Sequence, residues 1–136
     1  EAAEFAEIVN SAGLALIQLV APTTPAARLD RILQHASGFV YCIAVAGTTG
    51  AREALPQDLS AMLSRLREKT DLPLAVGFGV SRPDQVQGLK NVADGAIVGS
   101  ALVRCLEPPS NGQADPVAAV AAVNELASKL AAAAHS

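Results

Sequence analysis

Apolar residues recur along the chain with two alternating spacings, one typical of helices and the other of strands. Phe5, Ile8 and Ala12 lie three or four positions apart, which places them on one face of a helix that ends near Gly13. Residues 14–20 then form a nearly continuous apolar run. Such a run is typical of a strand that is buried on both faces of a parallel sheet.

The same alternation continues to the end of the chain. Further apolar strands are predicted at residues 39–45, 74–76 and 96–98, and a short helix at residues 101–106. Segments with helical spacing follow each strand. The apolar face of the helix predicted after the second strand consists of Leu59, Met62, Leu63 and Leu66.

Capping residues mark where several of these helices begin and end. Thr24 followed by Pro25 predicts one helix start, with the threonine hydroxyl as the cap, and Asp115 followed by Pro116 predicts another. Gly38 predicts a C-terminal stop. The order is therefore one helix and then four repeats of strand and helix.

Strands that alternate with helices indicate an α/β fold with parallel strands joined by right-handed crossovers. Two architectures fit this order: an open, doubly wound sheet, or part of a (β/α)8 TIM barrel. The repeats are nearly uniform and begin on a helix without a preceding strand, which favours the barrel. A whole barrel needs about 250 residues, and this chain has 136. We therefore expect residues 1–136 to form a single partial TIM-barrel domain with four parallel strands, the C-terminal half of a barrel.

Composition excludes several kinds of partner. The net charge is −3 with scattered Lys and Arg, aromatic residues make up 3% and there is no tryptophan. Neither nucleic acid nor a membrane surface is expected as a partner. Cys42 and Cys105 show no metal or redox spacing, so we expect reduced, buried thiols in a cytoplasmic protein.

Glycines follow two of the predicted strands. Gly77, Phe78 and Gly79 come after the third strand, and Gly99 and Ser100 come after the fourth. Glycine lets the backbone approach a ligand closely, and free N–H groups at the start of a short helix suit a phosphate. Barrel enzymes often bind phosphate after their last two strands. The sequence therefore predicts a phosphate site here, with ordinary tight turns as the alternative.

The segment after the second strand is long for a strand-to-helix connection. It contains Gly47, Thr49, Gly50 and Arg52, and its small residues are suited to a lid that closes over a site. An ordinary surface loop is the alternative. Thr49 is also suited to hydrogen-bonding a catalytic carboxylate from elsewhere in a complete barrel.

Tyr41 shares one strand face with Phe39 and Ile43. If that face points into the barrel, the tyrosine hydroxyl lies near the mouth and faces a ligand; a core tyrosine is the alternative.

Candidate catalytic groups are scarce. Most carboxylates fall on predicted helices or before strands, as Asp94 does, and only Glu53 lies near the expected catalytic face. His35 and His135 are expected in solvated positions. No catalytic pair or triad and no metal site can be assembled, so we predict neither catalytic residues nor a metal in this chain.

Five segments together resemble the tryptophan synthase alpha subunit. They match in order over almost the whole chain and correspond to the second half of that barrel, from its fourth helix to its last. The segments are residues 19–23, 37–41, 47–52, 74–81 and 94–101.

The resemblance implies a retro-aldol cleavage of indole-3-glycerol phosphate to indole and glyceraldehyde 3-phosphate. The residues that it implies for the glycerol phosphate are Gly50, Gly79, Gly99 and Ser100. It implies further that Phe78 and Ile97 line the indole pocket, with Tyr41 near the substrate. Thr49 matches the threonine of the lid, which also includes Gly47 and Arg52.

The resemblance also sets limits. The glutamate and aspartate that move protons in this family belong to the first half, so the missing first half of the barrel and the beta subunit are the expected protein partners. No cofactor is expected in this chain, since pyridoxal phosphate belongs to the beta subunit. Two alternatives stay open: a non-catalytic phosphate-binding half-barrel that acts by dimerisation or by pairing with a separate first half, and another phosphate-binding barrel of histidine or tryptophan biosynthesis.

Overall fold

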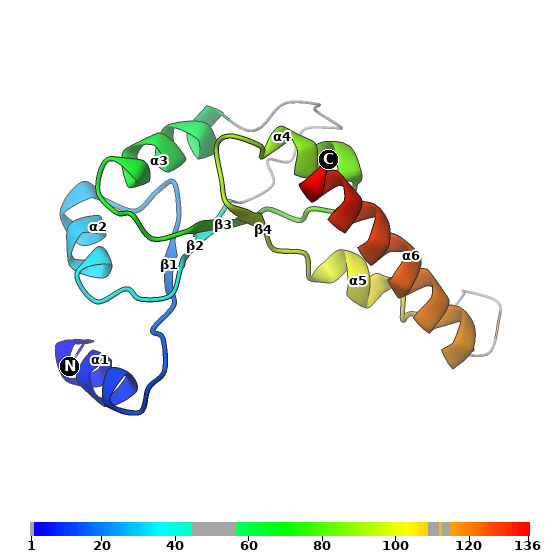
Figure 1. Ribbon diagram of the computed structural model, residues 1–136, viewed down its shortest axis with the longest axis horizontal. Helices are drawn as coiled ribbons and strands as arrows, with labels where there is room; N and C mark the ends of the chain where they lie inside the picture. Colours follow the sequence, from blue (N-terminus) through cyan, green and yellow to red (C-terminus); the bar gives the residue numbers. More distant parts are fainter. Residues whose placement is uncertain (1, 45–56, 109–111, 113–114) are drawn as a thin grey trace.

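The chain folds around one sheet of four parallel strands, in the order β1-β2-β3-β4 (Figure 1). The computed structural model describes residues 2–44, 57–108, 112 and 115–136. The strands are β1 (Gln18–Val20), β2 (Val40–Ile43), β3 (Leu74–Gly77) and β4 (Gly95–Ala96). Spatial order follows chain order with no reversal, so the structure agrees with part of a barrel and disagrees with a doubly wound sheet.

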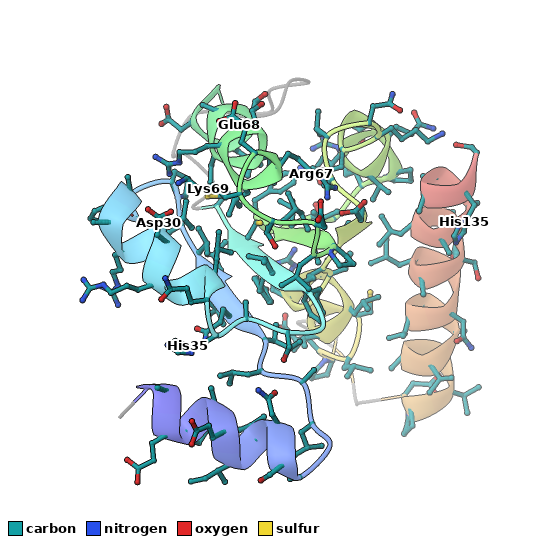
Figure 2. The ribbon with its side chains drawn as sticks, turned by 60° about the vertical axis from the view of Figure 1, so that its left-hand side comes forward. Asp30, His35, Arg67, Glu68, Lys69 and His135 are labelled. Carbon is teal, nitrogen blue, oxygen red and sulfur yellow. The ribbon has the colours of Figure 1, made fainter. Side chains whose placement is uncertain are left out.

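Helices precede, connect and follow the strands. Figure 2 shows them following one another around the sheet, from α1 through α2, α3 and α4 to α6. The helices are α1 (Ala2–Ser11), α2 (Ala26–Leu33), α3 (Gln57–Arg67), α4 (Pro83–Gly88), α5 (Ser100–Arg104) and α6 (Pro116–His135). The predicted alternation of strand and helix is therefore confirmed.

One face of the sheet is covered and the other is open. Along β2, Val40 and Cys42 are fully buried, whereas Tyr41 and Ile43 are only partly buried. Successive side chains of a strand point to opposite faces. The even positions of β2 therefore face the helices, and its odd positions face the space that the interior of a whole barrel would occupy.

The prediction of a long first strand buried on both faces was wrong. Only Gln18–Val20 is a strand, and Leu19 is 54% exposed while its neighbour Val20 is buried. The apolar run of residues 14–20 suits a strand whose face toward the barrel interior is covered by other side chains. This half of the sheet leaves that face open, so the side chains on it are exposed.

Helix α1 is similarly exposed. Phe5 and Ile8, which the helical spacing placed on a buried face, are 57% and 61% exposed. The helix itself forms as predicted, and Gly13 follows it with the positive φ of +73° that suits glycine. Phe5 and Ile8 thus have no covering partner among the described residues.

The core lies between the covered face of the sheet and its helices. All four residues of the predicted face on α3 are fully buried, together with strand residues such as Val40 and Val76. A smaller cluster joins α4 to α6 through Val86, Leu130 and Ala133. The two clusters share Phe78 and Ala96 as partly buried neighbours, so they adjoin at the ends of β3 and β4.

The caps show one success and two errors. Asp115 Oδ1 accepts hydrogen bonds from the first N–H groups of α6, as predicted. The Thr24 hydroxyl does not cap α2; it accepts instead from the Ala21 N–H at 3.0 Å. Helix α2 ends at Leu33, so Gly38 with its φ of +76° belongs to the turn into β2 and is not the stop of that helix.

Asp94 ties two strands to a helix at the amino ends of the strands. Its carboxylate accepts a 2.6 Å hydrogen bond from the Leu74 N–H and another from the Arg67 guanidinium. The hydrogen bond from Leu74 and the nearby Arg67 hold the pKa of Asp94 below its usual value. This position at the amino ends agrees with the placement of Asp94 before a predicted strand, away from the C-terminal face where barrel active sites lie.

Candidate phosphate site

The two glycine turns lie at the same edge of the sheet. Strand β3 runs into Gly77, Phe78 and Gly79, and the chain after β4 reaches Gly99 and Ser100. Because β3 and β4 are paired in parallel, both turns leave the sheet at its C-terminal edge. The structure therefore brings the predicted phosphate turns to one end of neighbouring strands.

Gly79 gives an open stretch of backbone. Its φ is +78°, and a Cβ added there would meet no atom within 4 Å among the described residues. The glycine is thus required by backbone conformation and not by packing. Its N–H donates to no acceptor in the described part of the chain.

Gly99 and Ser100 form the start of α5. Both are exposed, and the first helical N–H groups, those of Ser100 and Ala101, have no acceptor among residues 2–44, 57–108, 112 and 115–136. With five residues α5 has little dipole. What the turn offers to an anion is therefore its individual N–H groups and the Ser100 hydroxyl.

Tyr41 lies on the open face of the sheet and covers Gly77. A Cβ built on Gly77 would lie 2.7 Å from the Tyr41 hydroxyl oxygen and 3.2 Å from two atoms of its ring. Tyr41 is therefore not a residue of the helix-side core, and its hydroxyl is held at the C-terminal end of β3. Neither residue type nor spacing in the sequence signalled this close approach.

Phe78 and Ile97 occupy different surroundings. The Phe78 side chain is partly buried and packs against both core clusters. Ile97 follows β4, its N–H donates to the Val76 carbonyl at 2.8 Å, and its side chain is partly buried. Phe78 thus has a packing role in this chain, independent of any role in lining a pocket.

Several predicted site residues lie outside the described residues. They are Gly47, Thr49, Gly50 and Arg52.

The two N–H groups just before α4 already have an acceptor. The Gln85 carboxamide oxygen accepts from the N–H groups of Ser81 and Arg82, at 2.9 and 3.1 Å. The Arg82 guanidinium is paired with Asp84, and its hydrogen bond lowers the pKa of that carboxyl. The sequence had given no sign of this cap, which leaves the turns at Gly79 and Ser100 as the anion candidates.

Metal-binding side chains do not gather in the part of the chain that the structure describes. No group of three or more His, Cys, Asp or Glu side chains converges there.

Helix α6 is unusually apolar for its position. By length and composition it could cross a membrane, although that is weak evidence by itself. Leu130 and Ala133 are buried against α4, and the exposed Lys129 and Glu125 pair at 2.6 Å on the same helix. Part of the surface of α6 is therefore buried against α4, and the rest is uncovered in the described residues.

The sequence comparisons agree on one family. The family model of the tryptophan synthase alpha chain matches residues 1–135. The tryptophan synthase alpha chain of Chloroflexus aurantiacus is 43% identical over 134 residues, which cover 96% of this chain and 49% of that protein. That of Chloroflexus aggregans is 50% identical over 107 residues, covering 79% of this chain and 40% of that protein. This chain thus spans about half the length of these relatives.

Solved structures give the same result. A mutant tryptophan synthase alpha-subunit from Pyrococcus furiosus superposes with a TM-score of 0.78 at 34% identity, covering 96% of this chain and 50% of that one. Tryptophan synthase from M. tuberculosis gives 0.77 at 29% identity, covering 98% and 46%. The matches exclude a barrel from another biosynthetic family and identify the fold as part of a TIM barrel. The chain belongs to the tryptophan synthase alpha chain family.

Proposed function

We propose that this chain supplies the phosphate-binding half of the active site of a tryptophan synthase alpha subunit, a carbon–carbon lyase of tryptophan biosynthesis. The substrate is indole-3-glycerol phosphate, and retro-aldol cleavage releases indole and glyceraldehyde 3-phosphate. The observation that carries the proposal is the pair of open glycine turns at the ends of β3 and β4, with N–H groups that have no acceptor among the described residues.

The phosphate binds through backbone donors. The N–H groups of Gly79, Gly99 and Ser100 donate hydrogen bonds to the phosphate dianion. Binding needs no cationic side chain, because short charge-assisted hydrogen bonds are about twice as strong as neutral ones. The Ser100 hydroxyl adds one donor. Gly50, from the segment after β2, contributes a further backbone contact.

The rest of the substrate extends over the open face of the sheet. Tyr41 has its hydroxyl at the end of β3, near the reacting carbons. Ile97 and Phe78 line the indole pocket, as the family resemblance implies. Gly47, Thr49 and Arg52 belong to a lid that closes over the substrate and excludes water.

Proton transfer requires groups from the other half of the barrel. A retro-aldol cleavage needs an acid and a base at the reacting atoms, and we assign both to carboxylates of the first half. A beta subunit, which carries the pyridoxal phosphate, receives the indole in the cytoplasm. The chain alone is therefore expected to bind phosphate compounds weakly and to release no indole.

The test is reconstitution. The chain is co-expressed with the first half of the Chloroflexus aurantiacus alpha chain, and indole release from indole-3-glycerol phosphate is measured. Gly79→Ala keeps the backbone N–H but places a Cβ at a φ of +78°, so the turn must change its conformation and the N–H moves away from the phosphate. Loss of a hydrogen bond to a charged group costs about 1.5–3 kcal/mol, so KM should rise by about tenfold to a hundredfold. Gly13→Ala is the matched control, because Gly13 has nearly the same φ, equally open surroundings and no place in the site.

Three results would refute the proposal. One is indole release by the chain without a first half. The second is an unchanged KM for Gly79→Ala in the reconstituted enzyme. The third is a reconstituted complex that binds glycerol phosphate and has no lyase activity, which would favour the non-catalytic half-barrel.

A further inference from the structure

One side chain holds the turn between β3 and α4. The Gln85 carboxamide oxygen accepts hydrogen bonds from the Ser81 N–H at 2.9 Å and from the Arg82 N–H at 3.1 Å. The Ser81 hydroxyl donates to the same oxygen at 3.5 Å. A carboxamide oxygen has two lone pairs, so the two N–H groups occupy both. Gln85 thus fixes the backbone just beyond Gly79, the open glycine of the candidate phosphate site.

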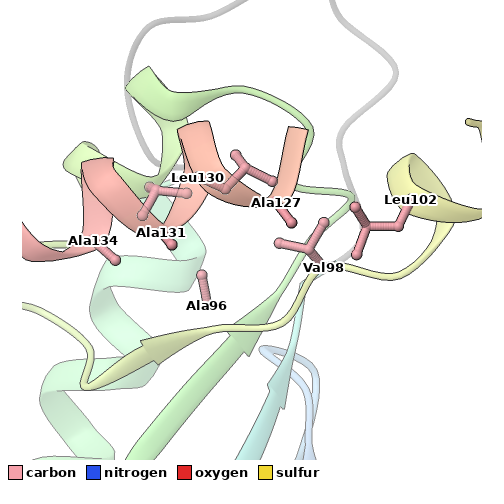
Figure 3. A pocket seen from close by; sticks show the side chains of 8 residues that line it. Ala96, Val98, Leu102, Ala127, Leu130, Ala131 and Ala134 are labelled. Atoms are coloured by element: carbon pink, nitrogen blue, oxygen red, sulfur yellow. The ribbon is translucent and has the colours of Figure 1, made fainter. Parts of the chain in front are cut away.

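Packing on both sides keeps this cap in place. Val80, which precedes Ser81, is 1% exposed. Val86, which follows Gln85, lines the apolar pocket beneath α6 together with Leu130 (Figure 3). Val80, Val86 and Leu130 belong to one buried cluster. The turn and the start of α4 are therefore joined both by packing and by the hydrogen bonds to Gln85.

The cap decides which N–H groups of the turn are free. N–H groups at the start of a helix have no partner within the helix, and they attract anions when nothing else accepts from them. Those of Ser81 and Arg82 lie close behind Gly79 in the chain, and Gln85 occupies both. The Gly79 N–H has no acceptor in the described ranges 2–44, 57–108 and 115–136 or at residue 112. A phosphate at this turn is therefore directed to Gly79 and away from α4.

The charge of the acceptor matters as well as its position. A glutamate in the first turn of a helix accepts the same hydrogen bonds and is favoured by the helix dipole. It would also place a negative charge within about 10 Å of the Gly79 N–H, since two residues span about 7 Å at most and the hydrogen bond to Ser81 adds 2.9 Å. Arg82 and Asp84 pair at 2.8 Å, so together they add no net charge. The neutral carboxamide thus supplies the cap without repelling a dianion.

We propose that Gln85 is a positioning residue of the phosphate site that also sets its preference for a dianion. Its carboxamide orients the turn at Gly79, withdraws the N–H groups of Ser81 and Arg82 from the anion, and adds no negative charge beside it. This inference rests on the proposed function and deepens it by naming a residue that acts on phosphate affinity without touching the substrate.

Two substitutions separate charge from geometry. Gln85→Glu keeps both hydrogen bonds and adds a charge. Gln85→Met keeps the length of the side chain and removes the acceptor. Gln87→Glu and Gln87→Met are the matched controls, because Gln87 is exposed on the same helix and the N–H groups of the turn donate to Gln85 instead.

Glycerol 3-phosphate is titrated into the 136-residue chain at about 0.01 M and about 0.3 M salt and followed by proton–nitrogen spectra. Gln85→Glu should weaken binding by about threefold at the lower salt concentration and hardly at all at the higher one, where charges about 10 Å apart are screened. Its urea midpoint should be unchanged or slightly raised. Gln85→Met should weaken binding several-fold at both salt concentrations, with new shifts at the Ser81 and Arg82 amides. Both Gln87 variants should bind like the unmodified chain.

Unchanged affinity of Gln85→Glu at low salt, or a loss of the same size at both salt concentrations, would overturn the inference, because a structural defect has no such salt dependence. An equal loss for Gln87→Glu or unchanged affinity of Gln85→Met would overturn it too. If the unmodified chain showed no saturable binding, both the inference and the proposed function would be refuted. Variants that behave as expected in a chain that releases no indole after reconstitution would refute the proposed function alone.

Discussion

Gly77→Ala tests the contact between β3 and Tyr41. The added Cβ would lie 2.7 Å from the Tyr41 hydroxyl oxygen and 3.2 Å from two ring atoms, so the ring must move away from the strand. Overpacking of this kind costs about 1–3 kcal/mol. Replacing glycine inside a strand returns about 0.5–1 kcal/mol of backbone entropy. The net expected loss in the free energy of unfolding is therefore about 1 kcal/mol, within a range of about 0–2.5 kcal/mol.

The assay is urea unfolding followed by circular dichroism, arranged as a double-mutant cycle with Tyr41→Ala. Gly77→Ala should destabilise the chain with Tyr41 present and have almost no effect, or a slightly stabilising one, with Tyr41→Ala. Gly88→Ala is the matched control: nothing lies within 4 Å of its Cβ and Gly88 ends α4, so it should be neutral or stabilising.

Equal losses for Gly77→Ala in both backgrounds would show that the contact with Tyr41 is not the cause. Such a result would also mean that close contact with Gly77 does not fix the position of the Tyr41 hydroxyl at the C-terminal edge of the sheet.

Three further predictions concern single side chains. Asp94→Ala should cost about 1 kcal/mol at pH 7, since it leaves the Leu74 N–H without its acceptor and the site is partly exposed. The pKa of Asp94 is lower in the folded chain than in the unfolded chain. The stabilisation by its carboxylate is therefore present at a pH above the unfolded pKa and is lost as the pH falls through the folded pKa. If Asp94→Ala cost the same free energy of unfolding at pH 7 and at pH 2, this assignment would be contradicted. Burial raises the pKa of Cys42 to about 11, so at pH 8 a thiol reagent should modify Cys105 first and Cys42 only on unfolding; comparable rates in the native chain would refute the assignment. Ser100→Ala should weaken phosphate binding several-fold without changing the urea midpoint, and a shifted midpoint would instead indicate a structural role for the hydroxyl.

The strand and helix order could be predicted because most of this half is packed against itself. The face of α3 formed by Leu59, Met62 and Leu66 is buried as its spacing predicts. Phe5 and Leu19 have the same apolar character and are exposed. Their pattern matches contacts that a whole barrel provides, so sequence reasoning predicts burial that this half cannot give.

Side-chain competition explains the errors at helix ends. Thr24 precedes a proline as a cap should, but its hydroxyl is occupied by the Ala21 N–H. Asp115 instead accepts from the Val117 and Ala118 N–H groups and so caps α6. Ala21 lies only three residues before Thr24, but the competing donor is a backbone N–H, which no residue type marks in the sequence.

Much of the candidate site follows from glycine positions alone. Gly79 and Gly99 come directly after apolar strands, and parallel pairing then places both turns at one edge. The approach of Tyr41 to Gly77 joins residues from different strands, and the Gln85 cap depends on a side-chain rotamer. Neither has a sequence signature, so both needed the structure.

The most direct test of the phosphate site is an amide titration. Proton–nitrogen spectra of the 136-residue chain are recorded while glycerol 3-phosphate is added, with sulfate-free buffer at constant ionic strength. The account predicts saturable shifts concentrated at the amides of Gly79, Gly99 and Ser100, with a Kd on the order of 1 mM, since backbone donors of half a site give modest affinity. No saturable shifts, or shifts spread over the charged surfaces of α2 and α3 instead, would contradict it.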